Sequence, residues 1–141
     1  MQLRVGLHLD GQRGDAVVPE LDAQTTGPLG LLNVLETQLG LLRQEPSASD
    51  RVLQYREALK RLDGPARFYH RSFAVDELGT AATLLAWRDL WHLHGWGDAT
   101  PPALAAAPSR RLRDMAAVEA EVAGQLALGI GERLAQVVLA M

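Results

Sequence analysis

Cysteine is the most informative absence from this 141-residue sequence. Without it the chain can form no disulfide, no thiolate metal site and no cysteine nucleophile. No apolar run approaches the roughly 20 residues that span a bilayer, and the N-terminus alternates apolar and polar residues instead of presenting a basic region and an apolar run. The sequence signals neither export nor membrane insertion, so we expect a soluble, cytoplasmic protein without a membrane partner.

Lysine is almost absent as well, since Lys60 is the only one. The formal net charge of −3 gives no global attraction to nucleic acid. Any contact with the DNA backbone must come from a local patch, and Arg110, Arg111 and Arg113 are the candidate residues. A metal-dependent nuclease of the restriction-enzyme type needs an acidic residue two positions before a lysine, and Ala58 stands at that position here.

Patterns for other catalytic chemistry are missing too. His92 and His94 are two apart on an expected helix and point about 200° away from each other, so they cannot share a metal ion as an i, i+4 pair can. No G-x-S-x-G motif occurs, and the serines stand at positions typical of caps and turns. We therefore predict no catalytic residue, no metal site and no cofactor in this segment, and we expect it not to be an enzyme.

The loop Gly27–Gly30 is the feature around which the rest of the chain is organised. A β-prone run at 16–18 leads through a short polar segment into this loop, and an apolar helix follows it. A strand, a glycine-containing turn and a helix N-terminus form the layout that phosphate-binding loops use. A Walker A loop places Lys and then Ser or Thr after its last glycine, whereas Leu31 and Leu32 stand there in this sequence.

Two interpretations of the loop stay open. In the first, Gly27, Pro28 and Gly30 form a degenerate nucleotide-binding loop that has lost the residues able to hold phosphate and magnesium. In the second, the loop is an ordinary helix start, with Thr26 near the N-cap and Pro28 in the first turn. Under both interpretations, we expect no bound nucleotide.

Hydrophobic periodicity divides the chain into a small β element and a helical remainder. Residues 3–9 alternate with the period of a strand that has one buried face, and a second short strand at 16–18 is stopped by Pro19. Ser47 with Asp50 three residues later resembles a capping box, while Asp76 and Ser109 are good N-caps. We predict helices from Gly27 to about 40–42, over about 49–62, over 76–95, from 109 through 126, and over 130–141, with 67–73 either helical or extended and a loop at 97–108.

The expected helix over 76–95 has an apolar stripe that is wide for a surface helix, because Leu84, Trp87 and Trp91 extend its buried side. We expect this helix to lie between two layers. Trp87, Trp91 and Trp96 could also stack on exposed bases. Tryptophans at i, i+4 on an apolar helix favour packing in a core or at a domain interface, and we expect that role for them.

Two stretches resemble one known family. The sequence from Thr26 to Leu41 is similar to the "GP-x-GLL-x-x-LE-x-x-LGL" opening of large bacterial proteins described as inactivated superfamily I helicases with a C-terminal PD-(D/E)XK nuclease, the AddB-like group. The stretch from Ser72 to Trp96 resembles a second element of the same proteins. The resemblance implies an ATPase-like shape without its phosphate-binding lysine, an accessory helical insertion after it, and a nuclease and any iron–sulfur site downstream of Met141.

We therefore expect an α/β, mainly helical chain, with a small N-terminal β element followed by about five helices. Residues 1–45 would form a degenerate nucleotide-binding element, the remnant of a P-loop-like helicase domain, and residues 46–141 a helical accessory region. Because the sequence ends inside an apolar helical run, we expect it to be part of a longer protein. A stop codon directly after Met141 in the gene would contradict this.

The favoured function is a non-catalytic scaffold within a helicase-nuclease that processes DNA double-strand breaks for recombinational repair. Its partners would be the downstream domains of the parent chain, a partner subunit of the helicase-nuclease and the DNA backbone. The alternative, from another class, is a free-standing helical protein–protein interaction domain unconnected with DNA. A working nucleotide-binding enzyme is disfavoured because Leu31 stands where the lysine is required.

Overall fold

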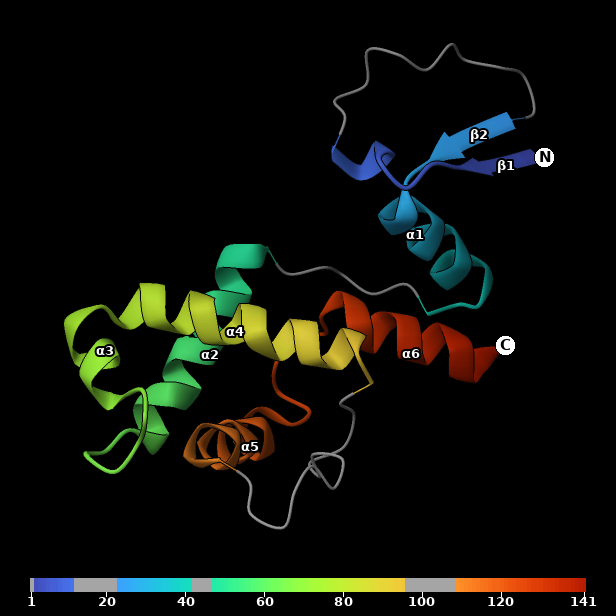
Figure 1. Ribbon diagram of the computed structural model, residues 1–141. Helices are drawn as coiled ribbons and strands as arrows, with labels where there is room; N and C mark the ends of the chain where they lie inside the picture. Colours follow the sequence, from blue (N-terminus) through green and yellow to red (C-terminus); the bar gives the residue numbers. More distant parts are fainter. Residues whose placement is uncertain (1, 12–22, 42–46, 96–108) are drawn as a thin grey trace. The chain divides into compact units, whose positions relative to one another are not determined.

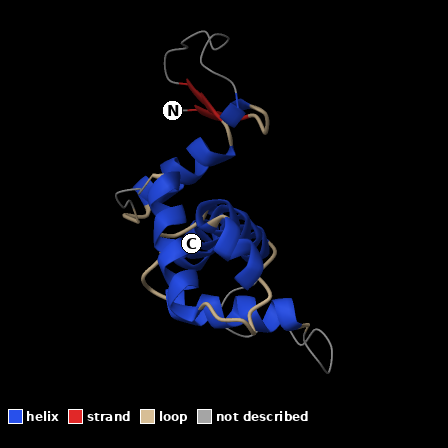
Figure 2. Cartoon of the chain, turned by 90° about the vertical axis from the view of Figure 1, so that its left-hand side faces the viewer, coloured by secondary structure: helices blue, strands red, loops and turns tan. Residues whose placement is uncertain are grey.

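The computed structural model describes residues 2–11, 23–41, 47–95 and 109–141, and these are mainly helical with one small sheet (Figure 1). Figure 2 shows the same predominance of helix over strand. Two compact units can be distinguished, residues 1–43 with 133–141 and residues 44–132, and each is described by itself. None of the described helices combines the length and the apolar character that a membrane crossing requires.

The first unit opens with two short strands, β1 (Gln2–Val5) and β2 (Ala23–Thr26), which pair in parallel over their whole length. Parallel strands cannot be joined by a tight hairpin and need a long connection. That connection includes a 3-10 helix, η1 (Leu9–Gly11). The N–H of Gly6 donates to the carbonyl oxygen of Thr26 (3.0 Å) and continues the ladder one residue beyond β1.

The N-terminal strand is shorter than the alternating sequence predicts, and the prediction that one of its faces is buried is wrong. The strand ends at Val5 because the chain turns, with the N–H of Leu9 donating to the carbonyl oxygen of Gly6 (3.1 Å). Val5 is 45% exposed and Leu7 87% exposed. The strand expected at 16–18 lies outside the described residues, and the strand that enters the glycine loop is instead Ala23–Thr26, whose threonines suit a strand.

Helix α1 (Pro28–Gln38) begins directly after β2, with Gly27 as its N-cap and Pro28 at its first position. Its end near Gly40 confirms the sequence prediction, since Gly40 has a φ of 69°, in the left-handed region that glycine adopts at helix ends. The strand, glycine turn and helix N-terminus expected for this stretch are therefore present, with the strand closer to the loop than predicted.

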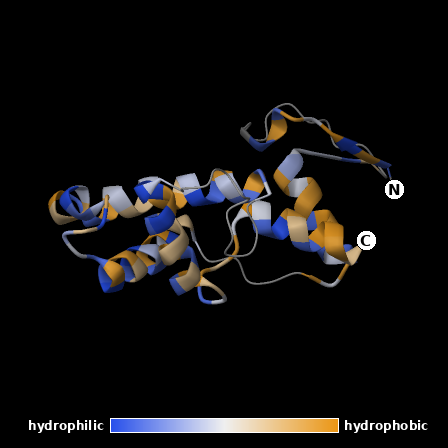
Figure 3. Cartoon of the chain, turned by 60° about the horizontal axis from the view of Figure 1, so that its bottom comes forward, coloured by the Kyte–Doolittle hydropathy of each residue, from blue (hydrophilic) through white to orange (hydrophobic). Residues whose placement is uncertain are grey.

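A buried ion pair holds the first unit together. The carboxylate of Glu36 accepts two hydrogen bonds from Arg133 (2.9 and 2.6 Å), and Arg133 also donates to the side chain of Asn33 (2.6 Å). Arg133 belongs to helix α6 (Ile130–Ala140), whose last turns are strongly hydrophobic (Figure 3). Val138 and Leu139 in these turns are 70% and 87% exposed.

The second unit packs α2 (Ala48–Leu62), α3 (His70–Val75), α4 (Glu77–Leu93) and α5 (Arg110–Val122) around one hydrophobic core. The helix starts confirm three predicted caps: Ser47 and Asp50 form a capping box, Asp76 accepts from the N–H of Gly79 (2.9 Å), and Ser109 accepts from the N–H of Leu112 (3.3 Å). The ambiguous stretch 67–73 contains the start of α3. The buried core comprises Tyr55, Ala58, Leu59, Tyr69, Phe73, Ala81, Leu84, Leu85, Met115, Val118, Val122 and Leu126.

Two core tyrosines differ in how their hydroxyl groups are satisfied. The hydroxyl of Tyr69 donates weakly to the carbonyl oxygen of Leu59 (3.5 Å), and burial raises the pKa of Tyr69 to about 12. Tyr55 is fully buried, and its hydroxyl has no hydrogen-bond partner among the described residues. Burial, followed by the nearby charge of Glu119, raises the pKa of Tyr55 further.

Within the second unit, helix α4 packs against the core on one side only, so this unit does not supply the second layer that the sequence predicts. Its inner face buries Ala81, Leu84, Leu85 and Arg88. On its other side Trp87 is 39% exposed and Leu90 51% exposed. The sequence placed apolar residues around most of the helix, and periodicity alone could not separate the side that packs from the side that faces outward.

Candidate functional site

A carboxylate of the chain itself, that of Asp10, binds the N-terminus of helix α1, where a phosphate group would otherwise bind. The N–H of Leu29, in the first turn of α1, donates to Oδ2 of Asp10 (2.8 Å), which belongs to η1. A helix N-terminus attracts anions because its first N–H groups lack partners within the helix. Asp10 therefore satisfies part of this demand and brings a negative charge to the place where a phosphate group would bind.

Close neighbouring side chains explain why glycine occupies two positions of the loop. A Cβ added to Gly27 would clash with Oδ1 of Asp10, and one added to Gly30 would clash with Oγ1 of Thr26. Gly27 must lack a side chain because the backbone nitrogen of Asp10 also lies too close, whereas a side chain at position 30 would require the hydroxyl of Thr26 to move. Leu32, which stands at the second position after Gly30, is only 1% exposed and serves the packing of the helix.

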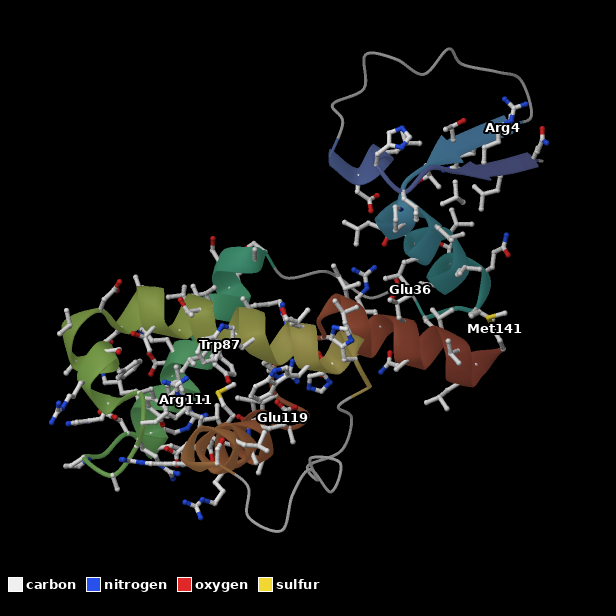
Figure 4. The ribbon with its side chains drawn as sticks, viewed as in Figure 1. Arg4, Glu36, Trp87, Arg111, Glu119 and Met141 are labelled. Carbon is white, nitrogen blue, oxygen red and sulfur yellow. The ribbon has the colours of Figure 1, made fainter. Side chains whose placement is uncertain are left out.

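Charged side chains gather around Arg88 in the second unit, although Arg88 is only 2% exposed. Its guanidinium donates to both oxygens of Glu119 (2.6 and 2.9 Å) and to both oxygens of Glu132 (3.0 and 2.7 Å). Glu119 projects from α5 toward α4 in Figure 4, and Glu132 comes from the start of α6. One cation thus joins three helices through two bidentate pairs, the strongest geometry for such contacts.

His92 completes this Arg88 cluster. Its Nε2 lies 3.1 Å from an oxygen of Glu119. His92, Glu119 and Glu132 each offer one ligand atom within 4.8 Å of the others, a spacing that a metal ion could bridge. The two carboxylates already bind the guanidinium of Arg88, however, so the cluster has its own internal cation. The arrangement fits a structural ion-pair network better than a metal or catalytic site.

The charges of the cluster stabilise one another's ionised forms. Burial by itself would raise the pKa of Glu132, but the hydrogen bonds from Arg88 and from the N–H of Gly129 (2.7 Å) outweigh it and hold the pKa below its usual value. Burial opposes the charged form of Arg88 as well, and its hydrogen bonds to Glu132 and Glu119 still raise its pKa. Each group therefore stays charged because of its partners.

Two further ion pairs tie neighbouring elements of the second unit to this framework. Arg51 of α2 donates to both oxygens of Asp89 on α4 (2.6 and 2.8 Å) and to the carbonyl oxygen of Ala127 (2.9 Å). Asp114 of α5 accepts from Arg67 (2.9 Å) and from the N–H of Phe68 (2.8 Å). The buried charges are thus paired and hydrogen-bonded, as burial requires.

The three arginines proposed for DNA lie in the first turn of α5 but do not form one face. Consecutive helical residues are separated by about 100°, so Arg110 and Arg113 share a side while Arg111 points away from Arg113. Arg110 also donates to the carbonyl oxygen of Ala66. Arg111, labelled in Figure 4, and Arg113 are exposed and form no ion pair or hydrogen bond with another described residue.

The tryptophans proposed for an interface occupy different environments. Trp87 on α4 is 39% exposed, whereas Trp91 is partly buried against the core. Trp96 lies outside the described residues. Of the three, only Trp87 is thus found with a substantial exposed surface in the part of the chain that the structure describes.

Sequence reasoning missed Asp10 and the Arg88 cluster. One signal was present, because Arg88 falls on the same helical row as Ala81, Leu84 and Leu85, and an arginine among buried positions requires carboxylate partners. The partners Glu119 and Glu132 are 31 and 44 residues away in sequence. No periodicity within a helix identifies contacts at such separations.

No family model matches this chain, and neither a curated protein nor a solved structure gives a significant match.

Replacing Arg88 with methionine should lower the free energy of unfolding by about 3–5 kcal/mol, because Glu119 and Glu132 would keep buried charges without a cation. Denaturant titration followed by circular dichroism measures the change. Arg56→Met is the matched control, since Arg56 pairs with the exposed Glu57 at the surface, and its loss should cost at most about 1 kcal/mol. Similar small losses in both variants would show that the cluster is not the framework described here.

Acid should weaken the second unit through Glu132. Because its folded-state pKa is depressed, the stabilisation is complete above the unfolded-state value of about 4.3 and is lost as the pH falls through the folded-state value. Glu132→Gln should therefore be less stable than the parent at neutral pH, and the difference should shrink in acid. Unfolding measured at several pH values tests this, with the exposed Glu77→Gln as control, and a difference independent of pH would contradict it.

Proposed function

We propose that this chain is a non-catalytic scaffold segment of a helicase-nuclease that processes DNA double-strand breaks for recombinational repair. The observation that carries the proposal is the Asp10 carboxylate at the N-terminus of α1. A parallel strand, a glycine turn and a helix are retained, while the anion position is taken by the chain itself. This combination supports the proposal, because a nucleotide-binding element that kept only its architecture would have these features.

The family resemblance of the sequence supports the same proposal. Its first stretch, Thr26 to Leu41, covers the glycine turn and all of α1. Its second stretch, Ser72 to Trp96, covers most of α3 and all of α4, the helix that carries Arg88. In this proposal the first unit is the remnant of the helicase domain, and the helices of the second unit are the accessory insertion.

A scaffold in such a protein works through contacts rather than chemistry. Its proposed partners are the downstream domains of the parent chain and a partner subunit of the helicase-nuclease, in the cytoplasm where bacterial DNA is repaired. The Arg88 cluster supports this role because it fixes α4, α5 and the start of α6 against one another and so presents a rigid surface. DNA backbone contact through the first turn of α5, with Arg110 and Arg113 on one side of the helix and Arg111 on another, is the further part of the proposal.

The second candidate is a free-standing helical protein–protein interaction domain. The observation that favours it is the exposed apolar side of α4, where Leu78, Leu90 and Leu93 are each about half exposed (48%, 51% and 49%). An exposed apolar patch of this kind marks a surface that binds another protein. This second candidate function requires neither DNA nor a parent helicase-nuclease.

The non-catalytic assignment predicts that the chain binds neither MgATP nor inorganic phosphate. Isothermal titration calorimetry of the full chain should give no saturable heat, because Asp10 repels an anion at the helix N-terminus and no lysine is present in the loop. Asp10→Asn keeps a capping oxygen and removes the charge, and it should also show no MgATP binding because the lysine is still lacking. Micromolar MgATP binding by the parent chain would refute the proposal.

The DNA part of the proposal predicts weak duplex binding that falls steeply with salt. Fluorescence anisotropy at low ionic strength should show this binding, and Arg113→Ala should lower the slope of log affinity against log salt by about 1 if Arg113 contacts a phosphate. The substitution Arg71→Ala removes an exposed arginine from α3 and is the matched control. No binding at low salt would remove DNA from the role of this segment.

A further inference from the structure

We draw no further inference here: the strongest candidate, the open groove between the outer side of α2 and the turn that follows α5, carries nothing because its two charged side chains, Glu57 and Arg61, already pair with Arg56 and Glu121 of the chain itself and nothing in the structure shows what would occupy it.

Discussion

The ion pairs of Arg88 are the contact on which the second unit depends. A guanidinium in a nearly water-free position can remain only because Glu119 and Glu132 approach it from two other helices. Hydrophobic packing alone would bring α2, α4 and α5 together without fixing their rotation, since leucine and valine contacts are tolerant of small shifts. The bidentate pairs require one rotation of α4, and this rotation determines which side of the helix faces outward.

The glycine loop of the first unit has the glycine pattern of a phosphate-binding turn but uses it for internal packing. Gly27 and Gly30 look like the glycines of a phosphate-binding turn, and each in fact makes room for a neighbouring side chain of the chain itself. Asp10, 17 residues before the loop along the chain, supplies the oxygen. The attraction of this helix N-terminus for an anion is thus satisfied by an internal carboxylate.

Local signals predicted most of the helical framework. Ser47, Asp76 and Ser109 mark helix starts because a side-chain oxygen next to free N–H groups is a local requirement, and Gly40 marks an end for a similarly local reason. The strands were less predictable, since β2 is four residues long and depends on pairing with β1. The Arg88 cluster could not be assembled from sequence, because the arginine and its two carboxylate partners stand on three separate helices.

Tyr55 makes the stability of the core depend on alkaline pH. Its phenol is enclosed without a hydrogen-bond partner among the described residues, and burial disfavours its ionised form. In the unfolded chain the same group ionises near pH 10, so alkali draws the chain toward states in which this ring is released. The buried phenol of Tyr55 therefore lowers the stability of the folded chain at alkaline pH, whereas the carboxylates around Arg88 lower it in acid.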